Sequence, residues 1–144
     1  MNSLVVGSTS QISHYFPRSF QRVSSRDYSS ALGKEWDSVY LCFGENRTYL
    51  ANDNRFRDAF YDVNYEMTMK AVRDFSPLAR RVVAYSTAEL WNDAVGAINP
   101  RTPRSDRSSS SSNHYIMSKH MLTSELLDKV AYPNVSIAYP FNFN

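Results

Sequence analysis

The sequence predicts a three-layer α/β fold, in which a doubly wound parallel sheet carries helices on both faces. Two observations predict this fold. Short apolar runs alternate along the chain with segments of helical periodicity. The runs are continuously apolar, which is typical of parallel strands buried on both faces. Right-handed crossovers between such strands build a doubly wound sheet.

Each apolar run is a predicted strand, and the runs span 3–6, 20–23, 36–43, 81–85 and 135–139. Helical patterns lie between the strands, at 11–15, 56–75, 88–97 and 114–130. Pro17 ends the first helical turn early, and little chain separates Ser25 from Trp36. The sequence therefore predicts that the first two crossovers are shortened.

Two polar segments are predicted loops, at 48–55 and 99–113. The second contains Pro100, Pro103 and a run of serines over 108–112, and it leads directly into the helix predicted over 114–130. A long polar loop of this kind is either a mobile lid over a site or an inert insertion, and the sequence favours neither interpretation.

Composition excludes several classes of function. The chain has 144 residues, 42% of them hydrophobic, which suits one domain over 1–144. A net charge of +2 without a basic stripe argues against nucleic acid as a partner. No apolar run reaches the length of a membrane span, and the N-terminus lacks a signal-peptide pattern, so we expect no membrane partner and a cytoplasmic location.

The single cysteine and the histidines do not indicate a metal site. Cys42 lies in an apolar run, where a core side chain is a better interpretation than a reactive thiol. One cysteine cannot form an internal disulfide, which favours a reducing compartment. His14, His114 and His120 are not at ligand spacing, so we predict no bound metal.

A strand followed by glycine opens the chain, where residues 5–13 read Val-Val-Gly-Ser-Thr-Ser-Gln-Ile-Ser. A strand that ends in glycine before a helix lets backbone N–H groups approach a pyrophosphate. The alternative is an ordinary turn between a strand and a helix.

A second pattern places Tyr115 and Lys119 four residues apart on a predicted helix, so that they share one face. A free tyrosine titrates near pH ~10, and a nearby cation lowers its pKa. Such a tyrosine can exchange a hydroxyl proton while a hydride moves. The alternative is a solvated lysine beside a half-buried tyrosine.

A third pattern places Ser86 and Thr87 at the carboxyl end of the strand predicted over 81–85. Ligands bind at that edge in open α/β sheets. The alternative is a helix N-cap, because Ser86 precedes Glu89 by three residues in a capping pattern. Both interpretations can hold together.

Taken in order, these patterns resemble the extended short-chain dehydrogenase/reductase family, which includes nucleotide-sugar epimerases and dehydratases. The resemblance rests on Gly7, Asn64 within 62–65, Ser86 with Thr87, Tyr115 with Lys119, and the run Tyr139-Pro140-Phe141-Asn142, which is similar to an Arg-Pro-Phe-Asn run in the family. It covers nearly the whole chain and implies a Rossmann-like, NAD(P)-binding domain.

The resemblance implies an NAD(P)-dependent oxidoreductase or epimerase that acts on a nucleotide-activated sugar by hydride transfer. Tyr115 would be the general acid/base, and Lys119 would lower its pKa and bind the nicotinamide ribose. Thr87 would hydrogen-bond the substrate. Dehydratases of the family carry an Asp-Glu pair after that threonine, but here Ala88 precedes Glu89. This counts against dehydration and leaves Glu89 as a base.

The implied cofactor site consists of Gly7, Ser8, Thr9, Ser10, Gln11, Ile12, Arg26, Tyr115 and Lys119. Ser10 and Ser13 replace two glycines of the family's fingerprint. The Ser10 side chain would oppose the approach of the pyrophosphate and Ser13 would crowd the helix, so binding would be weakened or lost. Arg26 slightly favours NADP over NAD, whereas Asp27 suits NAD.

These departures also motivate an alternative function, a non-catalytic relative that serves as a ligand-binding or assembly module. Family members continue with a substrate-binding part that this sequence lacks. Either the sequence is a fragment of a longer protein or a short protein has lost that part, and we expect a truncated sequence. Family members often dimerise through the helices that bear the Asn and Tyr motifs, which implies a homodimer contact at 56–75 and 114–130.

Overall fold

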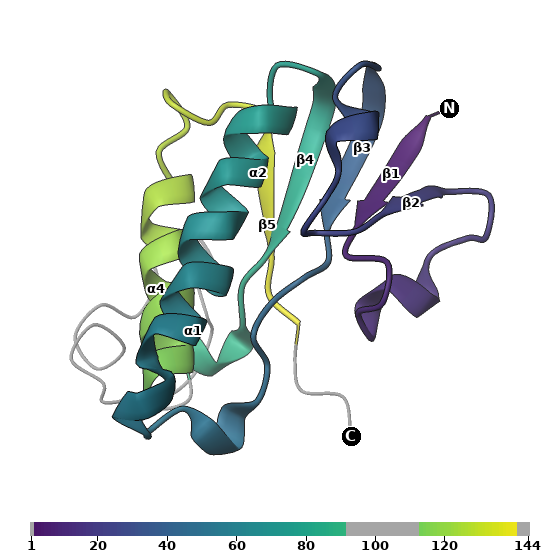
Figure 1. Cartoon of the computed structure of the whole chain (residues 1–144). Coiled ribbons are helices and arrows are strands. Elements are labelled where there is room, and N and C mark those ends of the chain that lie inside the picture. Colours follow the sequence, from purple (N-terminus) through teal and green to yellow (C-terminus); the bar gives the residue numbers. More distant parts are fainter. Residues whose placement is uncertain (1, 92–112, 141–144) are drawn as a thin grey trace.

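The computed structural model describes residues 2–91 and 113–140, and it contains a five-stranded parallel sheet (Figure 1). The strands are β1 (Ser3–Val6), β2 (Gln21–Val23), β3 (Trp36–Leu41), β4 (Ala79–Tyr85) and β5 (Val135–Ala138). Their order in the sheet is β2-β1-β3-β4-β5, and every neighbouring pair is parallel. The sheet therefore extends in both directions from β1, and the predicted Rossmann-like α/β fold is confirmed.

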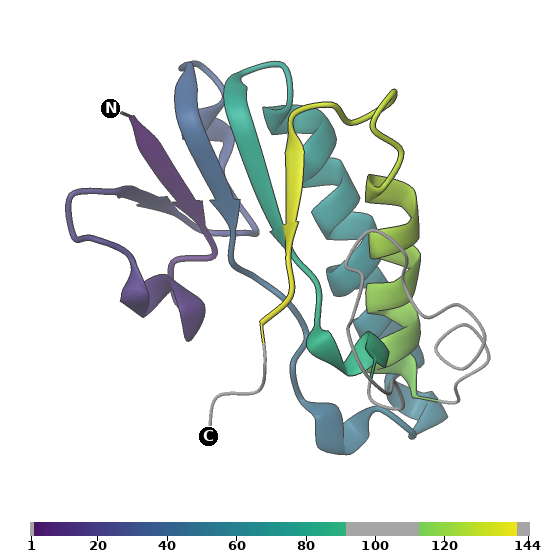
Figure 2. The ribbon, with the colours of Figure 1, turned by 180° about the vertical axis from the view of Figure 1, so that it is seen from behind.

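The long helices lie together on one face of the sheet (Figures 1 and 2). The first runs through α1 (Arg57–Tyr61), a π-helical segment η5 (Asp62–Met67) and α2 (Thr68–Phe75), and the second is α4 (His114–Leu126). Buried side chains of α2 and α4 pack there against alternate residues of β1, β3, β4 and β5. This packing forms the main core, because apolar residues of a buried strand alternate between two faces.

The opposite face carries the shortened first crossover. Between β1 and β2 the chain forms only the 3-10 helix η1 (Ile12–Tyr15), and between β2 and β3 only the 3-10 helix η2 (Ser29–Ala31). Phe16 and Phe20, which follow η1, pack on Tyr40 of β3 at ring-centroid distances of 4.6 and 6.1 Å. The prediction of shortened first crossovers agrees with these two connections.

The helix predicted over 56–75 is present but is not uniformly α-helical. Residues Asp62–Met67 are π-helical, and Thr68 Oγ1, at the start of α2, donates to the Val63 carbonyl of this segment at 3.1 Å. Segments of this kind are rare and frequently lie at functional sites. Asn64, which is fully buried, belongs to this segment.

Two predicted helices differ from the structure. The helix predicted over 114–130 ends at Leu126, because the Asp128 carboxylate accepts the N–H groups of Val130 and Ala131 and turns the chain. The helix predicted over 88–97 begins as the 3-10 helix η6 (Ala88–Trp91), and the rest of it lies outside the described residues. The loop predicted over 99–113 lies outside them as well, apart from Asn113.

Candidate functional site

A groove of about 700 Å³ opens at the carboxyl edge of β1, β2 and β3. Its walls come from the segments that follow these strands, and its lining residues include Gly7 to Gln11, Ser24 to Arg26, and Phe43 to Asn46. The volume is within the range of about 300–1,000 Å³ that is usual for ligand pockets. The groove lies where the sheet changes direction between β1 and β3, which is the usual binding position in open α/β sheets.

Gly7 allows the first wall of the groove to form. Its φ of +100° is a conformation that L side chains rarely adopt. A Cβ at this position would lie 3.0 Å from the backbone of Cys42 and Phe43, so the chain just after β3 approaches too closely for any side chain. The predicted role of Gly7 in a tight turn therefore has a geometric basis.

The serines that replace the fingerprint glycines are used inside the turn. Ser13 is 1% exposed, and its hydroxyl donates to the carbonyls of Ser8 and Ser10 at 3.1 and 2.6 Å. Ser10 Oγ accepts the Ser13 N–H at 3.2 Å. Because η1 is only four residues long, Ser13 is accommodated as a buried and fully bonded side chain.

Of the nine residues predicted for the cofactor site, six line this groove. These are Gly7, Ser8, Thr9, Ser10, Gln11 and Arg26. Ile12 begins η1, immediately after the wall. Tyr115 and Lys119 belong to α4, which packs beside η5.

Lys119 lies close to the groove from the helical side. Its ammonium donates to the Tyr85 carbonyl at 2.8 Å, and it lies 3.6 Å from where a Gly44 Cβ would be. The side chain is 4% exposed, and burial lowers the pKa of Lys119 to about 8. The site therefore holds a lysine whose charged form is disfavoured by its surroundings.

Tyr115 and Thr87 meet at the next strand end. Burial raises the pKa of Tyr115 above its usual value, and the hydrogen bond to the Thr87 side chain opposes this rise. The nearby Glu89 carboxylate raises the Tyr115 pKa further. Thr87 Oγ1 also accepts the Glu89 N–H at 3.2 Å. The structure thus brings together Tyr115, Thr87 and Glu89, which were predicted from separate patterns.

Asn64 joins the two helices to the groove. Its side chain accepts the Glu45 N–H at 2.8 Å and donates to the Glu45 carbonyl and to Ser118 Oγ. Gly44 gives this amide room, since a Cβ there would lie 3.1 Å from Asn64 Oδ1. The segment after β3 is therefore held in place by a buried amide of the π-helical segment.

The residues after β3 also belong to the groove, although the sequence did not predict them as site residues. Gly44, Glu45 and Asn46 line the groove. In the sequence, the feature that could have indicated them is Gly44, which ends the strand predicted over 36–43. A strand adjacent to β1 at the sheet's switch point contributes its carboxyl end to the same crevice. The sequence alone did not reveal that β3 is that neighbour.

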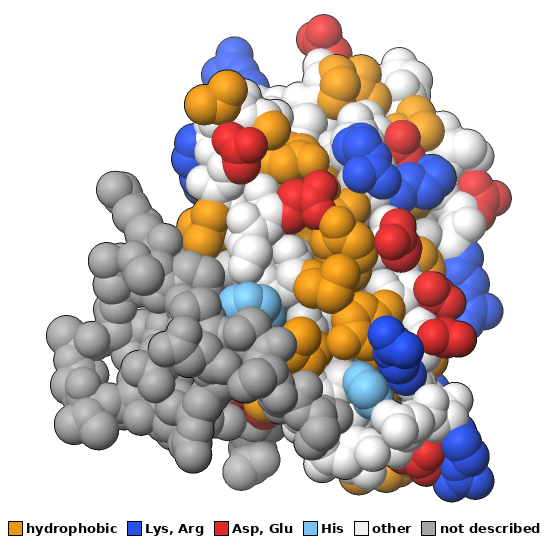
Figure 3. All heavy atoms as spheres, turned by 90° about the vertical axis from the view of Figure 1, so that its left-hand side faces the viewer, with side chains coloured by type: hydrophobic (Ala, Val, Ile, Leu, Met, Phe, Trp, Pro, Cys, Tyr) orange, Lys and Arg blue, Asp and Glu red, His pale blue; other side chains and the backbone are white. Residues whose placement is uncertain are grey.

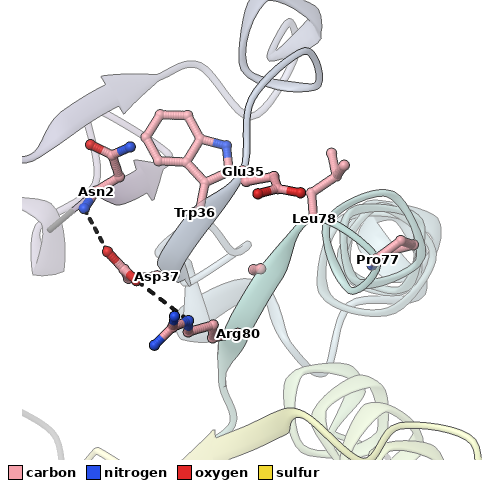
Figure 4. Close-up of a pocket in the computed structure, with 8 residues that line it drawn as sticks. Asn2, Glu35, Trp36, Asp37, Pro77, Leu78 and Arg80 are labelled. Carbon is pink, nitrogen blue, oxygen red and sulfur yellow. Dashed lines mark hydrogen bonds and ion pairs between the residues drawn. The ribbon is translucent and has the colours of Figure 1, made fainter.

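A second hollow, of about 410 Å³, lies at the opposite edge of the sheet (Figure 4). Asn2, Asp37 and Arg80 line it, and the Asp37 carboxylate binds the Asn2 N–H at 2.8 Å and the Arg80 guanidinium at 3.7 Å. The amino edge of a parallel sheet is not where such folds bind ligands, and none of the predicted site residues lines this hollow.

Among the described residues, no helix is both long and apolar enough to cross a bilayer. In the same part of the chain, no three His, Cys, Asp or Glu side chains form a group suited to a metal ion.

Comparison with known proteins identifies the fold. No family model and no curated protein matches the sequence. The structure is similar to RMD from Pseudomonas aeruginosa complexed with NADPH, with a TM-score of 0.68 at 16% identity over 99% of this chain. It is also similar to Pal from Bacillus thuringiensis, with a TM-score of 0.69 at 13% identity over 99% of this chain.

A third similar structure is a short-chain dehydrogenase/reductase superfamily protein from Agrobacterium tumefaciens with bound NAD. Its TM-score is 0.64 at 19% identity, over 96% of this chain. The chain spans about half the length of these proteins, namely 55%, 56% and 48% of the three. These similarities show that the chain has a fold like that of short-chain dehydrogenase/reductase proteins.

Proposed function

We propose that the groove beside β1 and β3 binds a nicotinamide dinucleotide. The groove itself carries this proposal, because three consecutive strand ends supply its lining. Gly7 provides a backbone surface without a side chain, and the residues from Ser8 to Gln11 that follow it line the groove. Two of the similar structures contain NADPH or NAD, which supports the same ligand class for this chain.

The proposed reaction is hydride transfer on a nucleotide-activated sugar, as an oxidoreductase or epimerase. When bound, the dinucleotide supplies or accepts the hydride. Tyr115 exchanges the proton of the reacting hydroxyl at its phenolic oxygen, and Thr87 orients that hydroxyl beside it. Lys119 provides a positive charge near the groove, held by the Tyr85 carbonyl, and binds the ribose. Glu89 lies near Tyr115 and is available as a second base.

A preference for NADP is proposed from the charges beside the groove. Arg26 lines both the main groove and an adjacent hollow of about 420 Å³, to which Lys70 also contributes. Two cations at this position suit the additional phosphate of NADP. Asp27 lines the same hollow and opposes this preference.

A fluorescence titration of the chain with NADPH and NADH tests the proposal. We expect saturable binding of both, with NADPH bound more tightly by about tenfold. Replacing Arg26 by alanine should remove that difference, while replacement of the exposed Arg18 by alanine should retain it. Absence of binding at millimolar dinucleotide would refute the proposal.

A non-catalytic ligand-binding or assembly module is the second candidate. Tyr115 and Lys119 are only 7% and 4% exposed, and burial acts on the pKa of each in the direction that favours the neutral form. Both features favour a site that holds a ligand without transferring protons. Dinucleotide binding without turnover of any nucleotide-activated sugar would identify this function.

We also propose a homodimer contact through the helical face. Figure 3 shows hydrophobic side chains among the charges on the side where α1 and α4 lie. Met121 of α4 is 37% exposed, whereas Leu122 and Leu126 of the same helix are buried. Light scattering should report twice the mass of the 16.5 kDa chain, and replacing Met121 by glutamate should yield the monomer. A monomeric wild type would exclude this contact.

A further inference from the structure

Arg22 of β2 contacts four backbone carbonyl groups of the crossover between β1 and β2. Its Nη2 donates to the carbonyls of Ser13 and Phe16, at 2.9 and 3.0 Å. Its Nη1 lies 3.5 Å from the carbonyls of Pro17 and Phe20, at longer range. One guanidinium therefore connects η1 to the segment that follows it by hydrogen bonds.

Arg22 adds a side-chain donor to a crossover that has few backbone hydrogen bonds of its own. The carbonyls of Ser13 and Pro17 already accept the N–H groups of Phe16 and Phe20, at 3.3 and 3.1 Å, and Arg22 is a second donor to each. A four-residue 3-10 helix leaves most of its end groups to partners outside the helix. Arginine suits this task because its planar fork presents several N–H donors at once. In the register of the sheet Arg22 is paired with Val5, which puts both on the face opposite the core formed by α2 and α4.

The bond from Arg22 to the Ser13 carbonyl continues to the wall of the groove. Ser13 Oγ donates to the carbonyls of Ser8 and Ser10, and both of these residues line the groove. The path from Arg22 to the wall thus passes through one residue. The aromatic contacts of Phe16 and Phe20 with Tyr40 hold the later half of the crossover, whereas Arg22 also reaches the half that forms the wall.

We propose that Arg22 is a positioning residue, which holds the Ser8 to Gln11 wall of the groove in the geometry that a dinucleotide requires. The inference rests on the proposed function and adds a residue outside the groove to it. Arg22 does not line the groove, so it acts through Ser13 rather than by contact with the ligand. A wall ordered before binding removes an entropic cost from the association.

Two measurements on the same set of proteins test this role. Amide hydrogen exchange by NMR, on the ligand-free chain, compares the N–H groups of Ser13, His14 and Phe16 in the turn with that of Cys42, which bonds to Val6 between β3 and β1. NADPH titration then gives the affinity. The set contains wild type, Arg22→Met, Arg22→Lys and the control Arg18→Met, which removes an exposed charge from the same crossover.

In Arg22→Met we expect turn amides to exchange about tenfold faster while the Cys42 amide is unchanged, with NADPH affinity about tenfold weaker. Arg22→Lys should be intermediate, because one ammonium cannot reach all four carbonyls. Arg18→Met should match wild type in both measurements. Faster exchange at Cys42 by the same factor would instead show a loss of overall stability and would overturn the inference.

The two proposals fail in different ways. A wild-type chain that binds no NADPH refutes the proposed function, and the role of Arg22 with it. Equal NADPH affinities of wild type and Arg22→Met refute the role of Arg22 alone. If Arg22→Met does not fold, Arg22→Lys decides, since wild-type affinity in that variant would refute the role and a weakened affinity with a native Cys42 amide would support it.

Discussion

Replacing Tyr115 by phenylalanine is expected to reduce the turnover of a nucleotide-activated sugar by about 10²- to 10⁴-fold. The substitution removes only the phenolic oxygen, the atom assigned to proton exchange. The phenylalanine ring fills the same volume as the tyrosine ring, whose centroid lies 6.4 Å from the centroid of the Phe60 ring. Loss of the hydrogen bond to Thr87 should cost about 1 kcal/mol of folding free energy.

The measurement is oxidation of NADPH by keto nucleotide sugars and reduction of NADP⁺ by hydroxy nucleotide sugars. NADPH affinity and thermal unfolding are recorded for each variant. Tyr61→Phe is the matched control, because Tyr61 is a tyrosine of α1 that packs edge-on against His114 of the same helix as Tyr115. It should retain the wild-type rate. A Tyr115→Phe variant with undiminished turnover would remove the proposed mechanism.

Replacing Lys119 by methionine is expected to increase the free energy of unfolding at pH 7 by about 2 kcal/mol. The buried ammonium has a pKa of about 8 in the folded chain, below the ordinary lysine value of 10.5. At pH 7 the lysine is charged in both states, so folding includes the full cost of removing that charge from water. Methionine avoids this cost and loses one hydrogen bond to the Tyr85 carbonyl.

The sign of the pH dependence follows from the same two values. Above pH 8 the folded lysine becomes neutral while the unfolded one stays charged until about pH 10.5, so the wild type gains stability as pH rises through this window. The advantage of Lys119→Met should therefore shrink between pH 8 and pH 10. Chemical denaturation at a series of pH values measures it.

Lys34→Met provides the control, because this lysine is exposed apart from a cation–π contact over the Trp36 ring at 5.9 Å. Its replacement should lower stability by about 1 kcal/mol at most and should not increase it. A destabilised Lys119→Met variant, or an advantage that stays constant up to pH 10, would contradict the assigned environment. The expected gain also means that Lys119 lowers the stability of the fold, as is common for residues kept for function.

The strands and the first turn were predictable because their signals are local. The run Leu4-Val5-Val6 has no polar residue that would allow one face to meet water, and Gly7 follows it directly. The structure explains why only glycine fits at position 7. Cys42 and Phe43, which follow β3 more than thirty residues later in the sequence, lie too close to this position for a side chain.

The contacts of the candidate site were less predictable, because they join residues far apart in sequence. The hydrogen bonds of Asn64 to Glu45 and Ser118 span 19 and 54 residues, and no spacing rule reports such pairs. Burial of Lys119 was equally hidden, since a lysine on an amphipathic helix usually faces solvent. The helix α4 ends at Leu126 because the Asp128 side chain forms local hydrogen bonds that compete with the helix. The sequence prediction followed the apolar periodicity instead and extended the helix to residue 130.

The π-helical turn over Asp62–Met67 has a consequence for the angular phase of its helix. Phe60, Asn64, Thr68 and Val72 are all buried, at steps of four residues. In an ideal α-helix each such step rotates the side chain by about 40°, so Val72 would point roughly 120° away from Phe60. The wider turn absorbs much of that rotation. One continuous helical segment can thereby place Phe60 against Tyr115 and Val72 in the main core.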